Sequence, residues 1–312
     1  MRIIVTGAAG FIGSSLSEAL LARDHDVIGI DCLTDYYSPA VKRGNLNAAL
    51  QSSRFTFLEE NLLDIDLPKV LDGCDVVFHE AAQAGVRESW GTTFQLYSDY
   101  NVLATQRLLE AAKAVPIKKF IFASSSSVYG NAERIPVCES DPLRPLSPYG
   151  VTKLAGEHLC HLYFVNYGVP ALSLRYFTVF GPRQRPDMAF HKFISALLRD
   201  EPLPLFGTGQ QTRDFTYIDD AVSANLCAIE KGKPGAVYNI GGGARISLNE
   251  AIELLEEISG RKARRKQVGS QKGDVLHTWA DTFLARKELG FQPRFNVVEG
   301  LEREFEWLNK SL

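Results

Sequence analysis

Short apolar runs alternate with amphipathic stretches along most of the chain. The runs that predict strands are residues 2–7, 27–31, 55–59, 75–79, 119–123, 170–174 and 237–241. Several of the intervals carry helical patterns, and two of the predicted helices are long, at about 93–114 and 148–167. Strands that alternate with helices predict a doubly wound α/β fold, in which helices cover both faces of a parallel sheet.

The first predicted strand ends in a glycine-rich turn, Gly-Ala-Ala-Gly-Phe-Ile-Gly at residues 7–13, and a helical pattern follows. Such glycines let the backbone approach a pyrophosphate, and the helix N-terminus adds N–H groups and a positive dipole. Asp31, 18 residues after Gly13, stands where a carboxylate can bind ribose hydroxyls and repel a 2′-phosphate. The unit predicts dinucleotide binding and favours NAD, while Lys42 and Arg43 in the next loop keep NADP open as an alternative.

A second motif lies at the start of the predicted helix at 148–167. Ser147 is typical of a helix N-cap and Pro148 of a first helical residue. Tyr149 and Lys153 are four residues apart and therefore share one helix face. An ammonium beside a phenol lowers the phenol pKa, which makes Tyr149 a candidate general base. The alternative is a solvated tyrosine and lysine on a surface helix, because this spacing is common by chance.

The composition narrows the classes of function. A chain of 312 residues can bury a large core in one or two domains. Its net charge of −3 argues against a nucleic-acid partner, and the basic run at 261–266 is interpreted as a solvated connection. No apolar run is long enough to span a bilayer, and an N-terminus that enters a strand at once predicts no signal peptide.

The cysteines are scattered and show no metal-ligand spacing. They are Cys32, Cys74, Cys138, Cys160 and Cys227. This usage predicts reduced thiols in a cytoplasmic protein and no metal site, with a reactive cysteine as the minor alternative.

The GxxGxxG spacing and the Tyr149–Lys153 pair together resemble the short-chain dehydrogenase/reductase superfamily. The chain length and the segment 211–220, which is similar to an RDF-x-[YH]-[VI]-x-D pattern, resemble its extended branch, the nucleotide-sugar epimerases and dehydratases. The resemblance covers essentially the whole chain and implies a Rossmann domain with a smaller C-terminal α/β substrate lobe. The implied boundaries are 1–176 and 213–247 for the NAD-binding domain, and 177–212 and 248–312 for the nucleotide-sugar lobe.

The resemblance also implies which residues meet NAD. It puts Asp64 at the adenine amino group and Asn101, on the first long helix, in the cofactor region. The full set expected to bind the cofactor is Gly7, Gly10, Phe11, Ile12, Gly13, Asp31, Leu63, Asp64, Ala81, Ala82, Asn101, Ser124, Tyr149, Lys153 and Tyr176.

The family completes its catalytic triad with a Ser or Thr, and Ser125 occupies that position. The resemblance implies that Tyr149 takes the proton of a sugar hydroxyl, Ser125 bonds the sugar oxygen, and Lys153 tunes Tyr149 and holds the nicotinamide ribose. Dehydratases of the family carry Asp-Glu directly after the triad hydroxyl, and UDP-glucuronate decarboxylases carry Glu at the second of these positions. Ser126 and Ser127 stand there in this chain, which favours epimerisation through a 4-keto sugar.

The sugar is inferred from a few further positions. UDP-glucose-type epimerases usually have Asn where this chain has Thr178, and the segments 82–87 and 185–189 are most similar to UDP-glucuronate 4-epimerases. The residues expected at a UDP-sugar are Arg87, Ser125, Ser126, Ser127, Thr178, Arg185, Arg213 and Asp274. In this set Arg213 grips the diphosphate, Asp274 binds the uridine ribose, and Arg185 meets the uronate carboxylate.

Some alternatives stay open. Many epimerases carry Arg just before the Gly-Asp at 273–274, and Gln271 and Lys272 occupy that area here, which leaves the diphosphate grip undetermined. The competing enzyme is a UDP-glucose or UDP-N-acetylglucosamine 4-epimerase, and the remote alternative is a non-catalytic NAD-sensing regulator. The family often dimerises through the two long helices, so a homodimer is expected.

Overall fold

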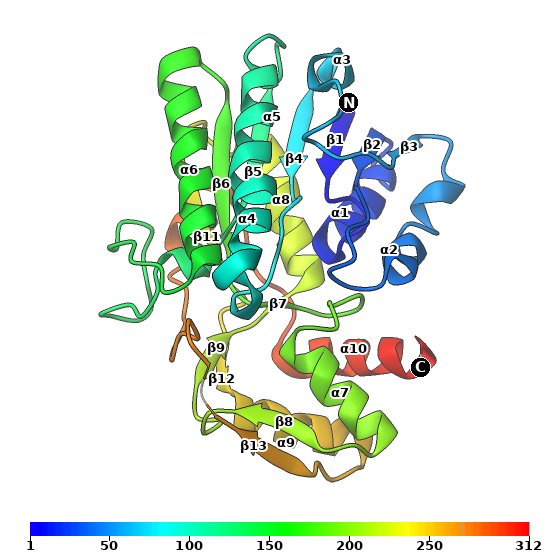
Figure 1. The fold of residues 1–312 in the computed structure, drawn as a ribbon, viewed down its shortest axis with the longest axis vertical. Coiled ribbons are helices and arrows are strands. Elements are labelled where there is room, and N and C mark those ends of the chain that lie inside the picture. The colour runs from blue at the N-terminus through cyan, green and yellow to red at the C-terminus, as the bar shows by residue number, and fades with distance from the viewer. Residues whose placement is uncertain (270, 312) are drawn as a thin grey trace.

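The computed structural model describes residues 1–269 and 271–311 and is built around a seven-stranded sheet (Figure 1). In spatial order its strands are β11 (Val237–Ile240), β6 (Ala171–Tyr176), β5 (Lys119–Ser125), β4 (Val76–His79), β1 (Arg2–Thr6), β2 (Asp26–Ile30) and β3 (Phe55–Leu58). Every neighbouring pair is parallel. The order runs outward from β1 in both directions, so the predicted doubly wound sheet is confirmed.

Helices cover both faces of this sheet. One face carries α1 (Phe11–Leu21) and α8 (Ile218–Lys231), and the other carries α3 (Leu67–Leu71), α5 (Ala104–Ala112) and α6 (Pro148–Tyr167). Successive side chains of a strand point to opposite faces. Ile3 and Val5 accordingly pack in the core beside α1, whereas Ile4 packs in the core beside α5. Burial on both faces explains why the strands appear in the sequence as continuous apolar runs.

The remaining elements form a smaller lobe below the sheet in Figure 1. It contains α7 (Ala189–Arg199), β8 (Leu203–Phe206), β9 (Thr212–Asp214), β12 (Arg245–Ser247), α9 (Leu248–Ser259), β13 (Arg265–Val268) and α10 (Val297–Ser311). Strand β8 pairs with β13 in parallel, and β9 pairs with β12 antiparallel. Two further strands, β7 (Val179–Phe180) and β10 (Thr216–Tyr217), pair with each other. The exact boundaries between the two domains stay a prediction.

Short elements complete the chain. They are α2 (Pro39–Asn45), α4 (Phe94–Tyr97), the tight turns η1 (Ala49–Gln51), η2 (Arg87–Ser89), η3 (Gly91–Thr93) and η5 (Ser126–Val128), and the wide π turns η4 (Ser98–Leu103) and η6 (Ala285–Leu289).

The helix predicted at 93–114 is not regular, because α4 and α5 are joined by the π turn η4. The turn carries Asn101, whose side chain accepts a hydrogen bond from Gln83 N at 2.7 Å and donates to Gln83 O at 3.0 Å. Its amide also donates to Thr152 Oγ1 at 2.9 Å. Such turns are frequent at functional sites, and this one fixes the loop that follows β4.

Helix α6 has the bounds and the cap that the sequence predicts. The Ser147 hydroxyl accepts a hydrogen bond from Gly150 N at 3.1 Å, and Pro148 is the first helical residue. The helix ends at Gly168, whose φ of 73° is left-handed and suits glycine. Its first turns lie against the carboxyl end of β5, where the Lys153 ammonium donates to Ala123 O at 2.7 Å.

Candidate active site

Two adjoining cavities lie at the carboxyl ends of the strands, where open α/β sheets bind their ligands. The smaller has a volume of about 200 Å³ and the larger about 690 Å³. They share the side chains of Tyr149, Tyr176 and Arg185, so one site continues into the other. Of the residues predicted to meet NAD, the smaller cavity is lined by Gly7, Gly10, Phe11, Ile12, Gly13, Asp31, Ala81, Ala82, Ser124, Tyr149, Lys153 and Tyr176.

The glycine turn forms one wall of the smaller cavity. Gly7 has a φ of 69°, and a Cβ there would lie 2.7 Å from Ala81 N, so only glycine lets β1 and β4 approach this closely. No side chain caps the N-terminus of α1, which begins at Phe11 after Gly10. Its first N–H groups and its dipole therefore suit an anion such as a pyrophosphate.

Asp31 is held at the end of β2. Its carboxylate accepts hydrogen bonds from Ala9 N at 3.1 Å and Leu33 N at 2.8 Å, and burial raises its pKa. Of the two cations that kept NADP open, Arg43 is paired with Glu59, whereas Lys42 lines the cavity near Asp31 and has its ammonium bonded to Thr34. Lys42 donates to Thr34 O at 2.7 Å, and Arg43 forms a bidentate pair with Glu59, with both distances 2.7 Å. The surroundings of Asp31 thus suit ribose hydroxyls better than a 2′-phosphate.

Three residues of the predicted cofactor set lie outside the lining of this cavity. Asp64 is exposed, and neither it nor Leu63 lines the cavity, whereas Asn61 and Leu62 do. The sequence signal that could have indicated Asn61 and Leu62 is the end of β3 at Leu58, because ligands of open α/β sheets lie close to the strand ends. Asn101 also lies outside the lining, and it supports the Gln83 backbone as described above.

The triad residues come together between the two cavities. Tyr149 lines both, Ser125 lines the larger and Lys153 the smaller. The Ser125 hydroxyl accepts from Ser127 N at 3.1 Å and lies 3.1 Å from the Ser127 hydroxyl. The tight turn after β5 thus keeps Ser125 at the edge of the substrate cavity. The catalytic roles given to these residues stay predictions.

The electrostatics of Tyr149 differ from the simple expectation. Burial raises the pKa of Tyr149, and the groups that oppose this are first the Arg185 guanidinium and then the Ser125 hydroxyl. Burial also lowers the pKa of Lys153 to about 8, and Glu80 would oppose this when ionised. The helical spacing brings Lys153 to the same face, but in the protein without ligand Arg185 is the cation that most favours the phenolate.

The larger cavity collects most of the residues predicted to meet the sugar nucleotide. Arg87, Ser125, Ser126, Ser127, Thr178, Arg185 and Asp274 line it. Two of its cations are already paired. Arg87 Nη2 lies 2.8 Å from Asp274 Oδ2, and Arg185 contacts the Asp187 carboxylate at 2.9 and 3.0 Å. The substrate therefore meets ion pairs as well as hydroxyl groups.

Arg213 does not line this cavity. Its guanidinium donates to the carbonyl groups of Thr212 at 2.9 Å and Leu276 at 3.1 Å, and so ties β9 to the segment after Asp274. The family pattern locates this arginine in the sequence but does not determine its rotamer, which depends on the carbonyl groups that the fold brings near it.

Sequence reasoning missed two side chains of the larger cavity. Lys192, on α7, lines it, and its ammonium forms no ion pair or hydrogen bond with the residues that the structure describes. Tyr36, five residues after Asp31, lines both cavities and donates to Asp187 at 3.3 Å. The two adjacent tyrosines in the loop after Asp31 could have indicated Tyr36. No sequence signal distinguishes Lys192 from other charged residues on the polar face of an amphipathic helix.

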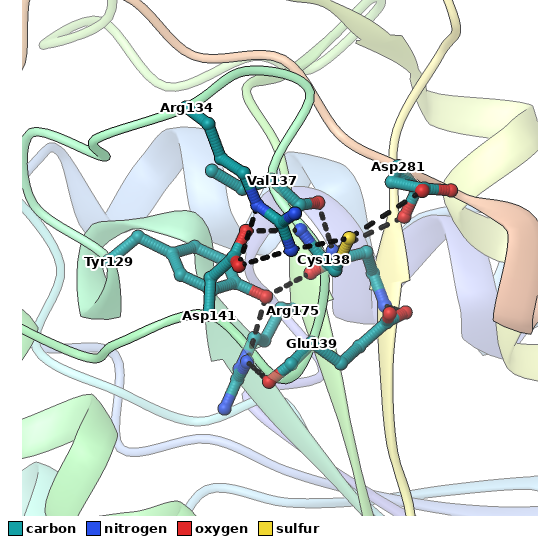
Figure 2. Close-up of polar contacts among 9 residues, drawn as sticks. Tyr129, Arg134, Val137, Cys138, Glu139, Asp141, Arg175 and Asp281 are labelled. Atoms are coloured by element: carbon teal, nitrogen blue, oxygen red, sulfur yellow. Dashed lines mark hydrogen bonds and ion pairs between the residues drawn. The ribbon is translucent and has the colours of Figure 1, made fainter.

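A buried polar network supports the site from behind. Arg175 pairs with Glu157 through distances of 2.8 and 2.7 Å, and Glu157 also accepts a hydrogen bond from Ser124, the neighbour of Ser125. Figure 2 shows the Arg175 guanidinium bonded to the Tyr129 hydroxyl and to the Glu139 carbonyl group.

The same view shows how the 134–141 segment is tied together and to the lobe. Arg134 pairs with Asp141 at 2.7 Å, and the Cys138 thiol lies 3.6 Å from the Asp281 carboxylate (Figure 2). Burial raises the pKa of Cys138, so the thiol is not activated as a nucleophile. All five cysteines are free thiols, as expected.

Two further classes of site are absent from the part of the chain that the structure describes. No helix there combines the length and apolarity needed to cross a membrane. Within the same residues, no group of three His, Cys, Asp or Glu side chains is placed to hold a metal ion.

Comparison with known proteins identifies the family. Residues 3–241 match the family described as NAD dependent epimerase/dehydratase. A Bacillus subtilis (strain 168) protein named "Uncharacterized UDP-glucose epimerase YtcB" is 49% identical over 99% of this chain and 98% of its own length. The UDP-glucuronate 4-epimerase of Thermodesulfobacterium geofontis is 38% identical over 99% of this chain and 96% of its own. The crystal structure of UDP-glucuronic acid 4-epimerase from Bacillus cereus with UDP-glucuronic acid and NAD has a TM-score of 0.98 at 48% identity, covering 100% of both chains. The protein therefore belongs to the NAD-dependent epimerase/dehydratase family.

Proposed function

We propose that this protein inverts C4 of UDP-glucuronate, giving UDP-galacturonate through a transient 4-keto sugar. The observation that carries the proposal is the pair of residues that directly follows Ser125, because Ser126 and Ser127 line the substrate cavity with hydroxyl groups where the dehydratases and decarboxylases of the family carry a carboxylate. Full-length relatives named UDP-glucuronate 4-epimerase support it, as does the 0.98 TM-score to the Bacillus cereus enzyme.

The residues of the smaller cavity fit NAD as the cofactor. The uncapped start of α1 suits the pyrophosphate, and Asp31 suits a ribose, as argued above. Gly10 supports the fit because a Cβ there would meet only Gly7 O, at 3.1 Å, and would otherwise take up open space in the cavity. When bound, NAD supplies reversible hydride acceptance at the sugar carbon.

The proton chemistry belongs to residues of the chain. Tyr149 takes the proton of the C4 hydroxyl as the sugar is oxidised, while Ser125 holds the sugar oxygen by a hydrogen bond. After the keto sugar presents its other face, Tyr149 returns the proton. Lys153 favours the phenolate during this exchange by its positive charge. No net proton is consumed, and no second substrate is required.

The same wall suits a uronate carboxylate. We propose that Ser126, Ser127 and Thr178 donate hydrogen bonds to it and that Arg185 contributes a charge moderated by Asp187. A 4-keto uronate is a β-keto acid, and it loses CO2 when the carboxylate bond stands perpendicular to the carbonyl plane. A clamp that holds the carboxylate near that plane suppresses the loss.

Incubation of the purified protein with UDP-glucuronate tests the proposal. We expect UDP-galacturonate as the main product, and we expect the reaction to proceed without added NADH or NADPH. A UDP-pentose as the main product would contradict the clamp. Tyr149→Phe, which lacks the exchanging proton, is the matched inactive control.

A UDP-glucose 4-epimerase is the second candidate, because the relative at 49% identity carries that name. The same assay with UDP-glucose and UDP-N-acetylglucosamine separates the two. We expect kcat/KM to be highest for the uronate, and a hexose preferred over the uronate would favour the second candidate.

We further propose that the protein forms a homodimer through α5 and α6, which lie side by side on one face (Figure 1). This region exposes four large apolar side chains, with relative exposures from 41% to 62%: Leu103, Val151, Leu162 and Val165. Apolar side chains gathered on an exposed surface are typical of a protein–protein interface. Val165→Glu should shift the mass measured by light scattering from dimer to monomer. Val41→Glu, at an exposed valine on α2, is the matched control and should not.

We also propose a cytoplasmic location, because five free thiols are typical of a reducing compartment. Fractionation of cells that express the chain, followed by immunoblotting, tests this, and enrichment outside the cytoplasmic fraction would contradict it.

A further inference from the structure

Glu80 is a carboxyl group of the cofactor cavity that the proposed reaction leaves without a role. It directly follows β4 and lines the smaller cavity together with Tyr149, Lys153 and Tyr176. Its Oε1 lies 3.0 Å from the Tyr176 hydroxyl. Glu80 is half-buried and lines the cavity, so a ligand there reduces its contact with water.

If Glu80 were ionised, the two short oxygen–oxygen contacts around the Tyr176 hydroxyl would have only one proton between them. The Tyr176 hydroxyl lies 3.0 Å from Glu80 Oε1 and 2.9 Å from Asn225 Oδ1. A phenol has a single proton to donate. If Glu80 were a carboxylate, two acceptors would compete for that proton, and one oxygen–oxygen contact would have no hydrogen between its atoms.

Reorienting the Asn225 amide does not remove the conflict. Its Nδ2 donates to Ala221 O at 2.9 Å within α8, which assigns Oδ1 to the Tyr176 side. A flipped amide would satisfy Tyr176 but would set Oδ1 against the Ala221 carbonyl oxygen. A protonated Glu80 resolves every contact, because Glu80 then donates to Tyr176 and Tyr176 donates to Asn225.

The surroundings agree with this count. Burial raises the pKa of Glu80 to about 7, against which the Tyr176 hydrogen bond and the Lys153 charge act. The titratable groups that face it are Tyr149 and Lys153 from α6 and Tyr176 from the end of β6, while α8 contributes only the neutral Asn225. Burial also raises the pKa of Tyr176 well above its ordinary value, so Tyr176 stays a neutral phenol.

We propose that Glu80 is held as a neutral carboxylic acid and acts as a positioning residue, which orders Tyr176 through its proton and keeps a negative charge away from Tyr149. An ionised Glu80 would raise the pKa of Tyr149 and so disfavour the phenolate that starts the reaction. The part of this inference that concerns turnover rests on the proposed epimerase function, whereas the protonation of Glu80 does not.

Infrared spectroscopy of the whole protein as purified tests the protonation. At about pH 6, one pH unit below the neutral-range pKa, the spectrum of the wild type minus that of Glu80→Gln should contain the C=O stretching band of a protonated carboxyl group. The band should fade as the pH rises, with a midpoint near 7. Glu230→Gln removes an exposed carboxylate on α8 and is the matched control, which should leave the band in place.

A second variant keeps the test independent of how well Glu80→Gln folds. Asn225→Leu removes the competing acceptor, so the Tyr176 proton becomes available to a Glu80 carboxylate. The midpoint of the carboxyl band should then move to lower pH. An unchanged midpoint would show that the proton count at Tyr176 is wrong.

The pH dependence of turnover tests the positioning role. A change of half a pKa unit in Tyr149 alters the phenolate fraction by about threefold. The ratio of kcat at about pH 8.5 to kcat at about pH 6.5 should therefore be about threefold higher in Glu80→Gln than in the wild type. An equal ratio, or a wild type without the infrared band at the lower pH, overturns the inference. A protein with the band but without turnover of any nucleotide sugar would keep the protonation of Glu80 and refute the proposed function instead.

Discussion

Replacing Arg175 with Met breaks the buried ion pair behind the active site. Arg175 and Glu157 are 3% and 5% exposed, and two hydrogen bonds of 2.8 and 2.7 Å join them. The substitution leaves the Glu157 carboxylate buried, with the Ser124 hydroxyl as its remaining side-chain donor. It also removes the donor that the Tyr129 hydroxyl accepts from at 2.7 Å.

The size of the loss follows from the burial. Removing one partner of a buried pair costs about 3–5 kcal/mol, because the other charge stays in a low dielectric without compensation. Unfolding releases about 2.1 cal/mol/K per residue, so a chain of 312 residues has an unfolding entropy of about 0.66 kcal/mol/K. A loss of about 4 kcal/mol should therefore lower Tm by about 6 °C. Urea unfolding monitored by circular dichroism gives the free energy, and calorimetry gives Tm.

Two further variants distinguish the effect of burial from the general effect of removing an arginine. Arg134→Met removes a guanidinium that is 65% exposed in its pair with Asp141, and it should cost less than about 1 kcal/mol. The double variant Glu157→Gln/Arg175→Met removes both charges and should be more stable than Arg175→Met alone. If Arg175→Met costs no more than Arg134→Met, the buried pair does not contribute as its geometry indicates, and the reasoning fails.

Three other predictions concern pH, cofactor choice and substrate choice. Burial raises the pKa of Glu304 well above its ordinary value, and its Oε1 has no hydrogen-bond partner in the described residues. The contribution of Glu304 to the unfolding free energy is therefore complete below the unfolded-state pKa of about 4.3 and is lost as the pH rises through the folded-state pKa. Glu304→Gln should therefore flatten the decline in unfolding free energy above that pH in urea titrations, and an unchanged slope would contradict this. Asp31→Asn should reduce the preference for NAD over NADP by about tenfold, equivalent to about 1.4 kcal/mol, in fluorescence titrations of both dinucleotides. Arg185→Ala should lower kcat/KM for UDP-glucuronate about tenfold more than for UDP-glucose, whereas an equal loss would remove Arg185 from the specificity argument.

The elements that local chemistry encodes were predicted closely. The apolar runs located the strands of the sheet, and Ser147 with Pro148 located the first turn of α6. Local signals were weaker where the backbone departs from a regular period. The π turn at Ser98–Leu103 interrupts an amphipathic pattern that looks like one helix, because the bonds from Asn101 to the Gln83 backbone come from a distant segment.

Family patterns located residues better than they located side chains. The segment that contains Arg213 matches its pattern, yet the guanidinium bonds to two carbonyl groups and does not line the substrate cavity. Asp64 follows β3 but lies beyond the residues that reach the cofactor cavity. In both cases a sequence pattern specifies the residue type and its order along the chain, whereas the distance between the side chain and the cavity depends on how loops fold back on the sheet.

The order of residues along this chain was enough to establish the sheet, the glycine turn, the Asp31 carboxylate and the pairing of Tyr149 with Lys153 on one helix face. These depend on periods and spacings of a few residues, which neighbouring peptide units enforce directly. The charge on each group was decided by packing between distant segments. Burial and Arg185 set the pKa of Tyr149, and Asp187 neutralises part of Arg185. Tyr176 meets Glu80 and Asn225, which come from two other segments of the chain. Desolvation and hydrogen bonding act through space, so these states exist only once the chain has folded.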